Sequence, residues 1–281
     1  MRERLWKIGT RVFDVSGHGL IMGVLNVTPD SFSDGGEFFA TEAAIRHGVE
    51  MARYGAAIID VGGESTRPGA KPVSPNEEME RVLPVIREIA PAIPAHISID
   101  TSKTGVARAA IEAGATIIND VTGGRGDSGM FALAAEKGVA LIIMHMQGTP
   151  QTMQLNPTYG DVVGEVADFF RQQFAQAVRS GVDPMCIAFD PGIGFGKTVA
   201  HNLDLLANLP RLQVENRPLV VGVSRKSFLG KVSALPEDRA SATVALSALL
   251  RARGAHVLRV HDVLPNANAL RAAEAVLAAT R

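Results

Sequence analysis

One pattern recurs along the whole chain and restricts its fold more than any other feature. A short run rich in valine, isoleucine and leucine ends in a polar residue, and a loop rich in glycine, proline and serine leads into an amphipathic stretch. The runs occupy residues 20–25, 57–61, 96–99, 116–118, 139–144, 185–189, 219–223 and 256–260. Dividing 281 residues by eight gives about 35 per unit, which suits a strand–helix–strand unit of ~30 or more. Near-continuous apolar strands alternating with helices predict a single-domain (β/α)₈ barrel over residues 1–281.

An open, doubly wound sheet is the competing architecture, because it shares the alternation of strand and helix. Its usual nucleotide motifs are missing. The glycine-rich segment GIGFGKT, residues 192–198, has three residues before its Gly-Lys pair where a phosphate-binding P-loop has four. Lys197 also stands where a dinucleotide-binding motif has its third glycine. The eight units therefore favour the barrel.

Helices are expected where the apolar residues recur with helical spacing. They are residues 41–54, 75 to about 90, 103–113, 159–180, 198–209, 240–253 and 265–281. Ser74, Pro75 and Glu77 predict a capping box at the second helix, and Pro84 predicts a kink in it. Residues 1–19 are expected to form a hairpin at the bottom of the barrel. Two polar loops, residues 28–39 and 62–73, are expected to overhang the opposite face as mobile lids.

Charge and composition exclude several classes of partner. The net charge is −1 without a basic block, which argues against nucleic acid and anionic membrane surfaces. The longest apolar runs, such as residues 139–144, are far shorter than the ~20 residues of a membrane helix. The first 15 residues lack an apolar signal segment, and the one cysteine, Cys186, lies in an apolar run. A cytoplasmic protein is expected.

Polar and ionisable residues follow all eight apolar runs. They are Asn26, Asp60, Asp100, Asn119, Asp120, His145, Asp190, Arg225, Lys226, Arg259 and His261. Any one of them could cap a helix or satisfy loop amides. In a (β/α)₈ barrel, however, the carboxyl ends of the strands converge on one rim, which carries the catalytic residues. The set therefore predicts an enzyme with its active site at this rim.

Two groups of these residues suggest two kinds of binding. Asp100, Asn119 and Asp190 offer hydrogen-bond acceptors, and Lys226 offers only donors. Together they suit a flat heterocycle with a donor edge, such as a guanine-like or pterin-like ring. Lys226 as a Schiff-base nucleophile is the rival interpretation.

The second group suits a phosphate. Arg259 and His261 lie two residues apart, and the first strand, which ends at Asn26, should be adjacent once the barrel closes. Arginine favours phosphate, and an asparagine carbonyl can bind Mg²⁺. A pyrophosphate site is therefore predicted. The histidines show no zinc-like spacing, and the chain has no G-x-S-x-G motif for a serine nucleophile.

Eight segments of the chain resemble the dihydropteroate synthase family. The two most specific are MGVLNVTPDSFSDGG at residues 22–36 and DPGIGFGK at residues 190–197. The others are residues 60–69, 98–101, 118–120, 144–148, 224–227 and 259–262. They occur in order from about residue 20 to residue 265.

The resemblance implies a reaction and a set of site residues. Family members condense 6-hydroxymethyl-7,8-dihydropterin pyrophosphate with 4-aminobenzoate to give 7,8-dihydropteroate and pyrophosphate, in folate biosynthesis. The family implies Mg²⁺ dependence, a cytosolic homodimer and sensitivity to sulfonamides. By matching position, the pterin pocket is Asp100, Asn119, Met144, Asp190, Phe195, Gly222 and Lys226. The pyrophosphate pocket is Asn26, Arg259 and His261, with Asn26 on the metal, and Thr66, Arg67, Phe195 and Ser227 face 4-aminobenzoate.

The catalytic roles are expected to fall to Lys226, Asp190, Arg259 and His261. Dissociative cleavage of the C–O bond is expected before the amine attacks, with the two polar loops excluding water. Two rivals remain. A pterin-binding methyltransferase shares the barrel and part of the pocket, and an inactive paralogue would bind a pterin or a partner without turnover.

Overall fold

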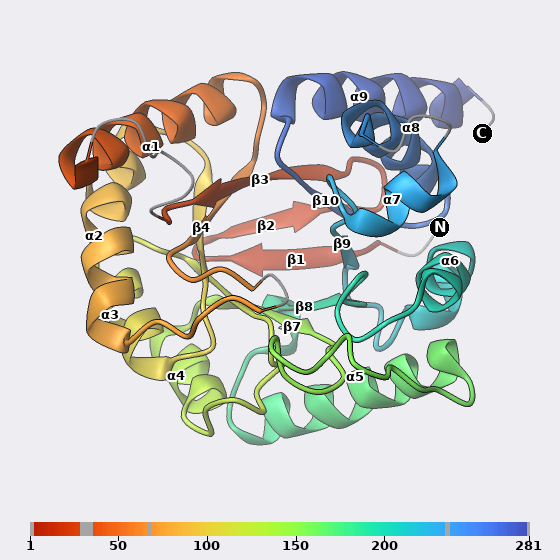
Figure 1. Cartoon of the computed structure of the whole chain (residues 1–281), viewed down its shortest axis with the longest axis horizontal. Helices are drawn as coiled ribbons and strands as arrows, with labels where there is room; N and C mark the ends of the chain where they lie inside the picture. Colours follow the sequence, from red (N-terminus) through yellow and green to blue (C-terminus); the bar gives the residue numbers. More distant parts are fainter. Residues whose placement is uncertain (1–2, 29–35, 67–68, 234–236, 280–281) are drawn as a thin grey trace.

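The computed structural model of this chain describes residues 3–28, 36–66, 69–233 and 237–279, and for residues 36–39 it describes the backbone alone. Within these ranges eight parallel strands form one sheet, with helices arranged around it (Figure 1). A separate antiparallel pair comes first in the chain, β1 (Leu5–Ile8) and β2 (Arg11–Asp14).

The eight parallel strands close into a barrel. They are β3 (Leu20–Asn26), β4 (Ile58–Gly62), β5 (His96–Asp100), β6 (Ile117–Asp120), β7 (Ala140–Met144), β8 (Ile187–Asp190), β9 (Val220–Val221) and β10 (Val257–Val260). Their hydrogen-bonded order is β8-β7-β6-β5-β4-β3-β10-β9. The two outer strands meet where Phe189 bridges Leu219, and the Phe189 N–H donates to the Pro218 carbonyl at 2.9 Å. All eight apolar runs are strands, which confirms the predicted (β/α)₈ barrel.

The helices lie outside the barrel. They are α1 (Gly36–Arg53), α2 (Pro75–Ala92), α3 (Thr104–Glu112), α4 (Met130–Lys137), α5 (Val162–Arg179), α6 (Val199–Ala207), α7 (Ser227–Val232), α8 (Arg239–Ala252) and α9 (Val263–Ala279). Two of these helices, α4 and α7, are not predicted by the spacing of apolar residues in the sequence. They have only 8 and 6 residues, too few to show the helical spacing of apolar residues over several turns. Among the described residues, no helix is both long and apolar enough to cross a membrane.

Two predicted helix starts are corrected or qualified by the structure. α1 begins at Gly36, inside the stretch expected to be a loop over residues 28–39; the stretch that follows has no proline to oppose a helix. At α2 the Ser74 hydroxyl accepts the Glu77 N–H at 3.3 Å, as predicted. The Glu77 carboxylate pairs with Arg81, one turn further on. Pro84 lies inside α2, which continues to Ala92.

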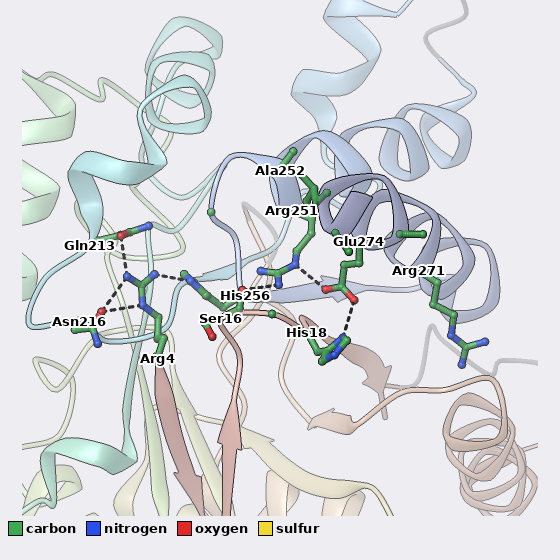
Figure 2. A pocket seen from close by; sticks show the side chains of 15 residues that line it. Arg4, Ser16, His18, Gln213, Asn216, Arg251, Ala252, His256, Arg271 and Glu274 are labelled. Carbon is green, nitrogen blue, oxygen red and sulfur yellow. Dashed lines mark hydrogen bonds and ion pairs between the residues drawn. The ribbon is translucent and has the colours of Figure 1, made fainter. Parts of the chain in front are cut away.

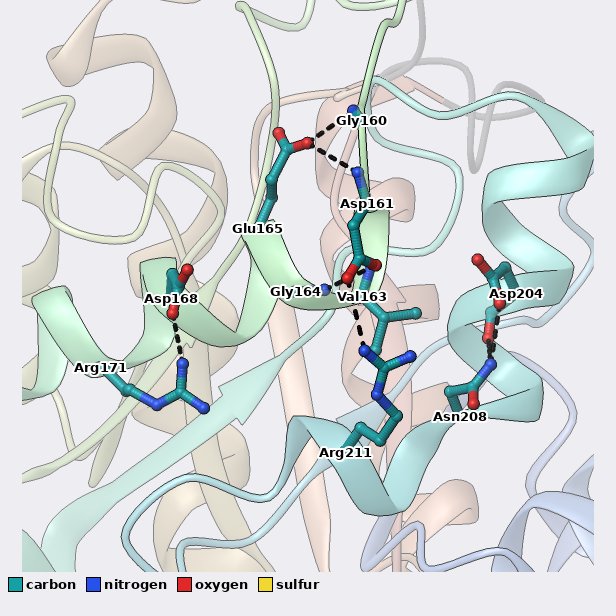
Figure 3. Close-up of polar contacts among 10 residues, drawn as sticks. All are labelled: Gly160, Asp161, Val163, Gly164, Glu165, Asp168, Arg171, Asp204, Asn208 and Arg211. Atoms are coloured by element: carbon teal, nitrogen blue, oxygen red, sulfur yellow. Dashed lines mark hydrogen bonds and ion pairs between the residues drawn. The ribbon is translucent and has the colours of Figure 1, made fainter.

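The start of α5 shows how local side chains define a helix boundary (Figure 3). Asp161 Oδ1 accepts the N–H groups of Val163 and Gly164 at 3.1 and 3.0 Å. Glu165 Oε1 accepts the N–H groups of Gly160 and Asp161 at 2.7 and 3.2 Å. Both carboxylates satisfy amides that the first helical turn leaves unpaired. The helix therefore starts at Val162, three residues later than the spacing of apolar residues predicted.

The N-terminal hairpin fills the bottom of the barrel, as predicted. Trp6 and Ile8 of β1 are fully buried. They pack against the inward-facing residues near the beginnings of the strands, namely Met22, Ile58, Ile117, Ala140, Ile142, Ala188, Val220 and Val257. The indole Nε1 of Trp6 donates to the Cys186 carbonyl at 3.1 Å. A larger apolar layer lies between the sheet and the helices.

Removing this plug should destabilise the fold. We expect Trp6→Ala to lower the free energy of unfolding by ~3–5 kcal/mol, because a large buried aromatic ring leaves a cavity. Trp6 is the only tryptophan, so the measurement is denaturant unfolding followed by circular dichroism. Val12→Ala in β2 is the matched control, since Val12 is 52% exposed and its loss should change stability by no more than ~0.5 kcal/mol. Equal effects of the two substitutions would contradict the role of the hairpin.

Candidate active site

The strand register places the predicted site residues next to one another at the carboxyl ends of the strands. Asp100 of β5 and Asn119 of β6 are paired across neighbouring strands. Met144 of β7 and Asp190 of β8 form the next such pair. Asn119, Met144 and Asp190 are 4%, 4% and 6% exposed. The predicted ring-binding side chains therefore share one rim of the barrel.

A charged network forms the floor of this site. Arg259 of β10 donates from Nε to Asp60 Oδ2 and from a terminal nitrogen to Asp100 Oδ2, each at 2.7 Å. Asn119 donates its amide to the same Asp60 oxygen at 3.1 Å. Asp60, a rim residue for which the sequence predicts no role in binding, thus supports both Arg259 and Asn119. These contacts reach across the barrel from β10 to β4, β5 and β6.

The network is buried, and burial shifts the pKa values within it. Burial raises the pKa of Asp100 to about 7, and the attraction of Arg259 opposes that rise. Burial alone would lower the pKa of Arg259, but the nearby carboxylates of Asp60 and Asp100 outweigh it and raise the pKa. Arg259 is therefore a permanent cation, whereas the charge of Asp100 depends on its neighbours.

Lys226 and Asp190 are a second pair of buried ionisable groups, and they attract each other electrostatically. Lys226 Nζ donates to the Ile193 carbonyl and lies 4.8 Å from the centre of the Phe195 ring. Burial lowers the pKa of Lys226 to about 8, against the attraction of Asp190. Burial also raises the pKa of Asp190, and the attraction of Lys226 opposes it. The Asp190 Oδ1 atom accepts the Gly192 N–H at 2.7 Å.

Three acceptor oxygens of this site have no hydrogen-bond partner among the described residues. They are Asp100 Oδ1, Asn119 Oδ1 and Asp190 Oδ2. The second polar atom of each of these side chains makes one of the hydrogen bonds described above. A flat ring with several N–H groups on one edge matches such a set. Met144 and Phe195 belong to one small apolar cluster beside these oxygens, which supplies a wall for the face of a ring.

Asn26 lies near this floor, whereas His261 contacts Ser224. The His261 N–H donates to Ser224 Oγ at 3.1 Å, and its Nδ1 lies 2.9 Å from the same oxygen. Asn26 ends β3, and a side-chain carbon built on Gly62 would lie 3.9 Å from Asn26 Oδ1 and 3.5 Å from Asp100 Cβ. The structure thus places Arg259 among the acidic residues of the floor and His261 against Ser224.

The structure describes some, but not all, of the remaining predicted site residues. Ser227 is the first residue of α7 and is exposed, and Thr66 is partly buried. A side-chain carbon on Gly222 would lie 3.6 Å from Arg259 Cβ, so Gly222 borders the floor. Arg67 lies outside the described residues, as do residues 29–35 and 68 of the two expected lid loops.

Two residues that contact the site were not assigned by sequence. Lys197 is 3% exposed and holds the loop that carries Phe195. Ser224 is 6% exposed and holds His261. The position of Lys197, a charged residue in an apolar, glycine-rich loop, was a sequence signal of a special role. Ser224 gives no comparable signal, because serine is common in loops.

Asn26 could hold a metal ion together with waters and a substrate phosphate. Among the described residues, no group of three or more His, Cys, Asp or Glu side chains could hold a metal ion without other ligands. Mg²⁺ usually takes one or two protein oxygens and completes its shell with waters and substrate phosphates. The partly exposed amide of Asn26, at the end of β3, fits that kind of single anchor.

A cavity of about 840 Å³ lies at the other end of the barrel (Figure 2). Two of its cations, Arg4 and Arg251, are engaged in structural contacts. Arg4 donates to Asn216 Oδ1 at 3.1 and 3.3 Å and contacts His256, and Arg251 pairs with Glu274 at 2.7 Å. These contacts tie the hairpin and α8 to neighbouring segments. Because catalytic residues of such barrels lie at the carboxyl ends of the strands, we assign the site to the opposite rim.

Comparisons with known proteins agree with the geometry. The sequence model of the family described as pterin binding enzyme matches residues 22–261. Dihydropteroate synthase of Escherichia coli (strain K12) is 46% identical over 277 residues, which cover 98% of this chain and 97% of that protein. Xanthomonas albilineans dihydropteroate synthase with 4-aminobenzoic acid superposes with a TM-score of 0.91 at 42% identity, covering 99% of both chains. Yersinia pestis dihydropteroate synthase, in a sulfonamide drug complex, superposes with a TM-score of 0.90 at 40% identity, covering 98% of this chain and 99% of that chain. This chain belongs to the dihydropteroate synthase family.

Proposed function

We propose that the protein condenses 6-hydroxymethyl-7,8-dihydropterin pyrophosphate with 4-aminobenzoate, giving 7,8-dihydropteroate and pyrophosphate in folate biosynthesis. The observation that carries the proposal is the set of three acceptor oxygens, on Asp100, Asn119 and Asp190, with the Lys226 ammonium in the same site. The acceptors suit the amino and N–H edge of a pterin. Lys226 suits the ring carbonyl and nitrogen on the other edge.

The apolar wall and the floor complete the pterin pocket. Met144 and Phe195 would contact the ring, and Gly222 leaves room beside Arg259. The carboxylates of Asp100 and Asp190 would favour positive charge on the ring. Asp60 has no direct role in this account; it holds Arg259 and Asn119 in place.

Asn26, Arg259 and His261 would serve the leaving group. When bound at Asn26, Mg²⁺ supplies positive charge that neutralises the pyrophosphate oxygens. Arg259 carries a permanent positive charge, and His261 has a ring fixed by Ser224. Both would stabilise negative charge as it develops on pyrophosphate.

The reaction balances without a strong base. The C–O bond breaks, its electron pair leaves with pyrophosphate, and the dihydropterin ring stabilises the resulting cation. The neutral aromatic amine then forms the new C–N bond and releases one proton. Thr66, Arg67, Phe195 and Ser227 would orient 4-aminobenzoate, as the resemblance implies.

The test is release of pyrophosphate with both substrates, with and without Mg²⁺. We expect equimolar pyrophosphate and 7,8-dihydropteroate, only when both substrates are present, and a loss of rate when EDTA removes the metal. Methyl transfer from methyltetrahydrofolate to a corrinoid would identify a methyltransferase instead. Pterin binding without product would identify an inactive paralogue.

A cytosolic homodimer and inhibition by sulfonamides are part of the same proposal. Leu249 of α8 and Leu264 of α9 are 47% and 43% exposed, which would suit a contact between two copies. Light scattering during gel filtration measures the assembly. Sulfonamides should compete with 4-aminobenzoate, since they imitate its ring and its acidic end.

A further inference from the structure

Lys197 is a buried lysine that the proposed reaction does not use, and burial lowers its pKa to about 7. It is 3% exposed, and its Nζ lies 3.0 Å from His145 Nδ1, 3.0 Å from the Phe195 carbonyl and 3.4 Å from the His145 carbonyl. An ammonium only donates, so His145 Nδ1 accepts. Burial lowers the pKa of His145 to about 2, which keeps that ring neutral. All hydrogen-bond partners of the ammonium are therefore neutral, and burying it in this way is costly.

The loop that Lys197 closes carries three parts of the pterin site. Asp190 lies at its start, and the Ile193 carbonyl accepts from Lys226. The Phe195 ring lies 4.8 Å from Lys226 Nζ. Lys197 holds the carbonyl of Phe195 itself. Lys197 thus contacts Phe195, the residue whose ring lies against Lys226.

The loop is packed closely on the residues that follow β7. A side-chain carbon at Gly192 or Gly196 would overlap the carbonyl oxygen of His145 or Gln147. Both glycines have positive φ, 64° and 61°. Tyr159 donates its hydroxyl to the Gly196 carbonyl at 2.8 Å. This backbone is therefore anchored near Gly196 without Lys197, whereas the Phe195 carbonyl depends on Lys197.

We propose that Lys197 is a positioning residue for Lys226. Its ammonium fixes the loop to His145 and so sets the Phe195 ring and the Ile193 carbonyl against Lys226. Its loss should loosen Lys226 and weaken pterin binding. This inference rests on the proposed function, because it assumes that Lys226 binds the pterin.

The experiment is a double-mutant cycle with Lys197→Met and Lys226→Met. Calorimetry measures the affinity for dihydropterin pyrophosphate without 4-aminobenzoate, so turnover is not needed. We expect Lys197→Met to weaken binding about tenfold, as for the loss of one charged hydrogen bond, and to change the affinity less than twofold when Lys226 is already Met. In steady state, KM for the pterin should rise; KM for 4-aminobenzoate is not diagnostic, because Phe195 also borders that substrate. Lys7→Met, an exposed lysine paired with Asp183 at the barrel bottom, is the matched control.

Several results would overturn the inference. Equal pterin affinity in Lys197→Met and wild type would do so, as would full additivity with Lys226→Met. If Lys197→Met does not fold, His145→Leu removes one of the same contacts and should raise the pterin KM; an unchanged pterin KM would count against the inference. Wild type that binds the pterin but makes no product overturns the proposed function alone.

Discussion

Arg259→Met is expected to lower kcat/KM by roughly two to three orders of magnitude. Arg259 joins Asp60 and Asp100 in a buried network, and removing one group that stabilises charge in the transition state typically costs ~10²–10³ in rate. The loss has two sources. The leaving group loses a permanent cation, and two carboxylates are left without their counter-charge.

The same substitution should change the dependence on pH. The pKa of Asp100 is raised to about 7 even though Arg259 opposes the rise. A group with a raised pKa must lose its proton before it can act as an anionic acceptor, so kcat/KM should rise with pH through this value. Without Arg259 the midpoint should move to higher pH. The pH profile of kcat/KM measures this shift.

Arg108→Met is the matched control for this experiment. Arg108 also makes two hydrogen bonds to a carboxylate, Glu136, at 2.7 and 2.8 Å, but its side chain is 41% exposed. Its loss should change stability by less than ~1 kcal/mol and leave kcat/KM unchanged. Similar kinetics for the Arg259 and Arg108 variants would refute the assignment of Arg259.

Lys226→Ala and Asp190→Asn should each lower kcat/KM by roughly one to two orders of magnitude. A hydrogen bond to a charged group contributes ~1.5–3 kcal/mol, and each substitution removes one charge from the ring-binding set. Steady-state kinetics with both substrates varied measures the loss. Near-normal kinetics in either variant would remove the pterin assignment.

Lys226 also predicts an alkaline limit to activity. Because its pKa is lowered to about 8, the ammonium should lose its proton above that pH and kcat/KM should fall. In Lys226→Arg the cation persists, so the fall should move to higher pH even if the maximum rate is lower. An unchanged alkaline limb in this variant would show that another group titrates.

The sequence predicts the barrel well because the strands are buried on both faces and therefore read as nearly continuous apolar runs. It also places Asp100, Asn119 and Asp190 at the rim, since each ends such a run. It does not predict α4 and α7, which have only 8 and 6 residues. The spacing of apolar residues shows where a strand pattern gives way to a helix pattern. A helix with few residues, however, shows too little of its pattern to be recognised.

Contacts across the barrel could not be predicted from one sequence. The spacing of Arg259 and His261 suggested that they act together, yet Arg259 reaches Asp60 and Asp100 on strands far away in the chain. That reach depends on the closure and register of the whole sheet. The contact of Lys197 with His145 likewise depends on how two loops pack, which leaves no periodic trace in the sequence.

The central claim is that the acceptor set at the carboxyl ends of the strands binds the pterin. Calorimetric titration with dihydropterin pyrophosphate tests it most directly, with Asp190→Asn at the rim and Arg4→Gln in the cavity at the barrel bottom. We predict one site per chain, with affinity weakened roughly 10- to 100-fold by Asp190→Asn and unchanged by Arg4→Gln. Wild-type affinity in Asp190→Asn, or loss of binding in Arg4→Gln, would contradict the account.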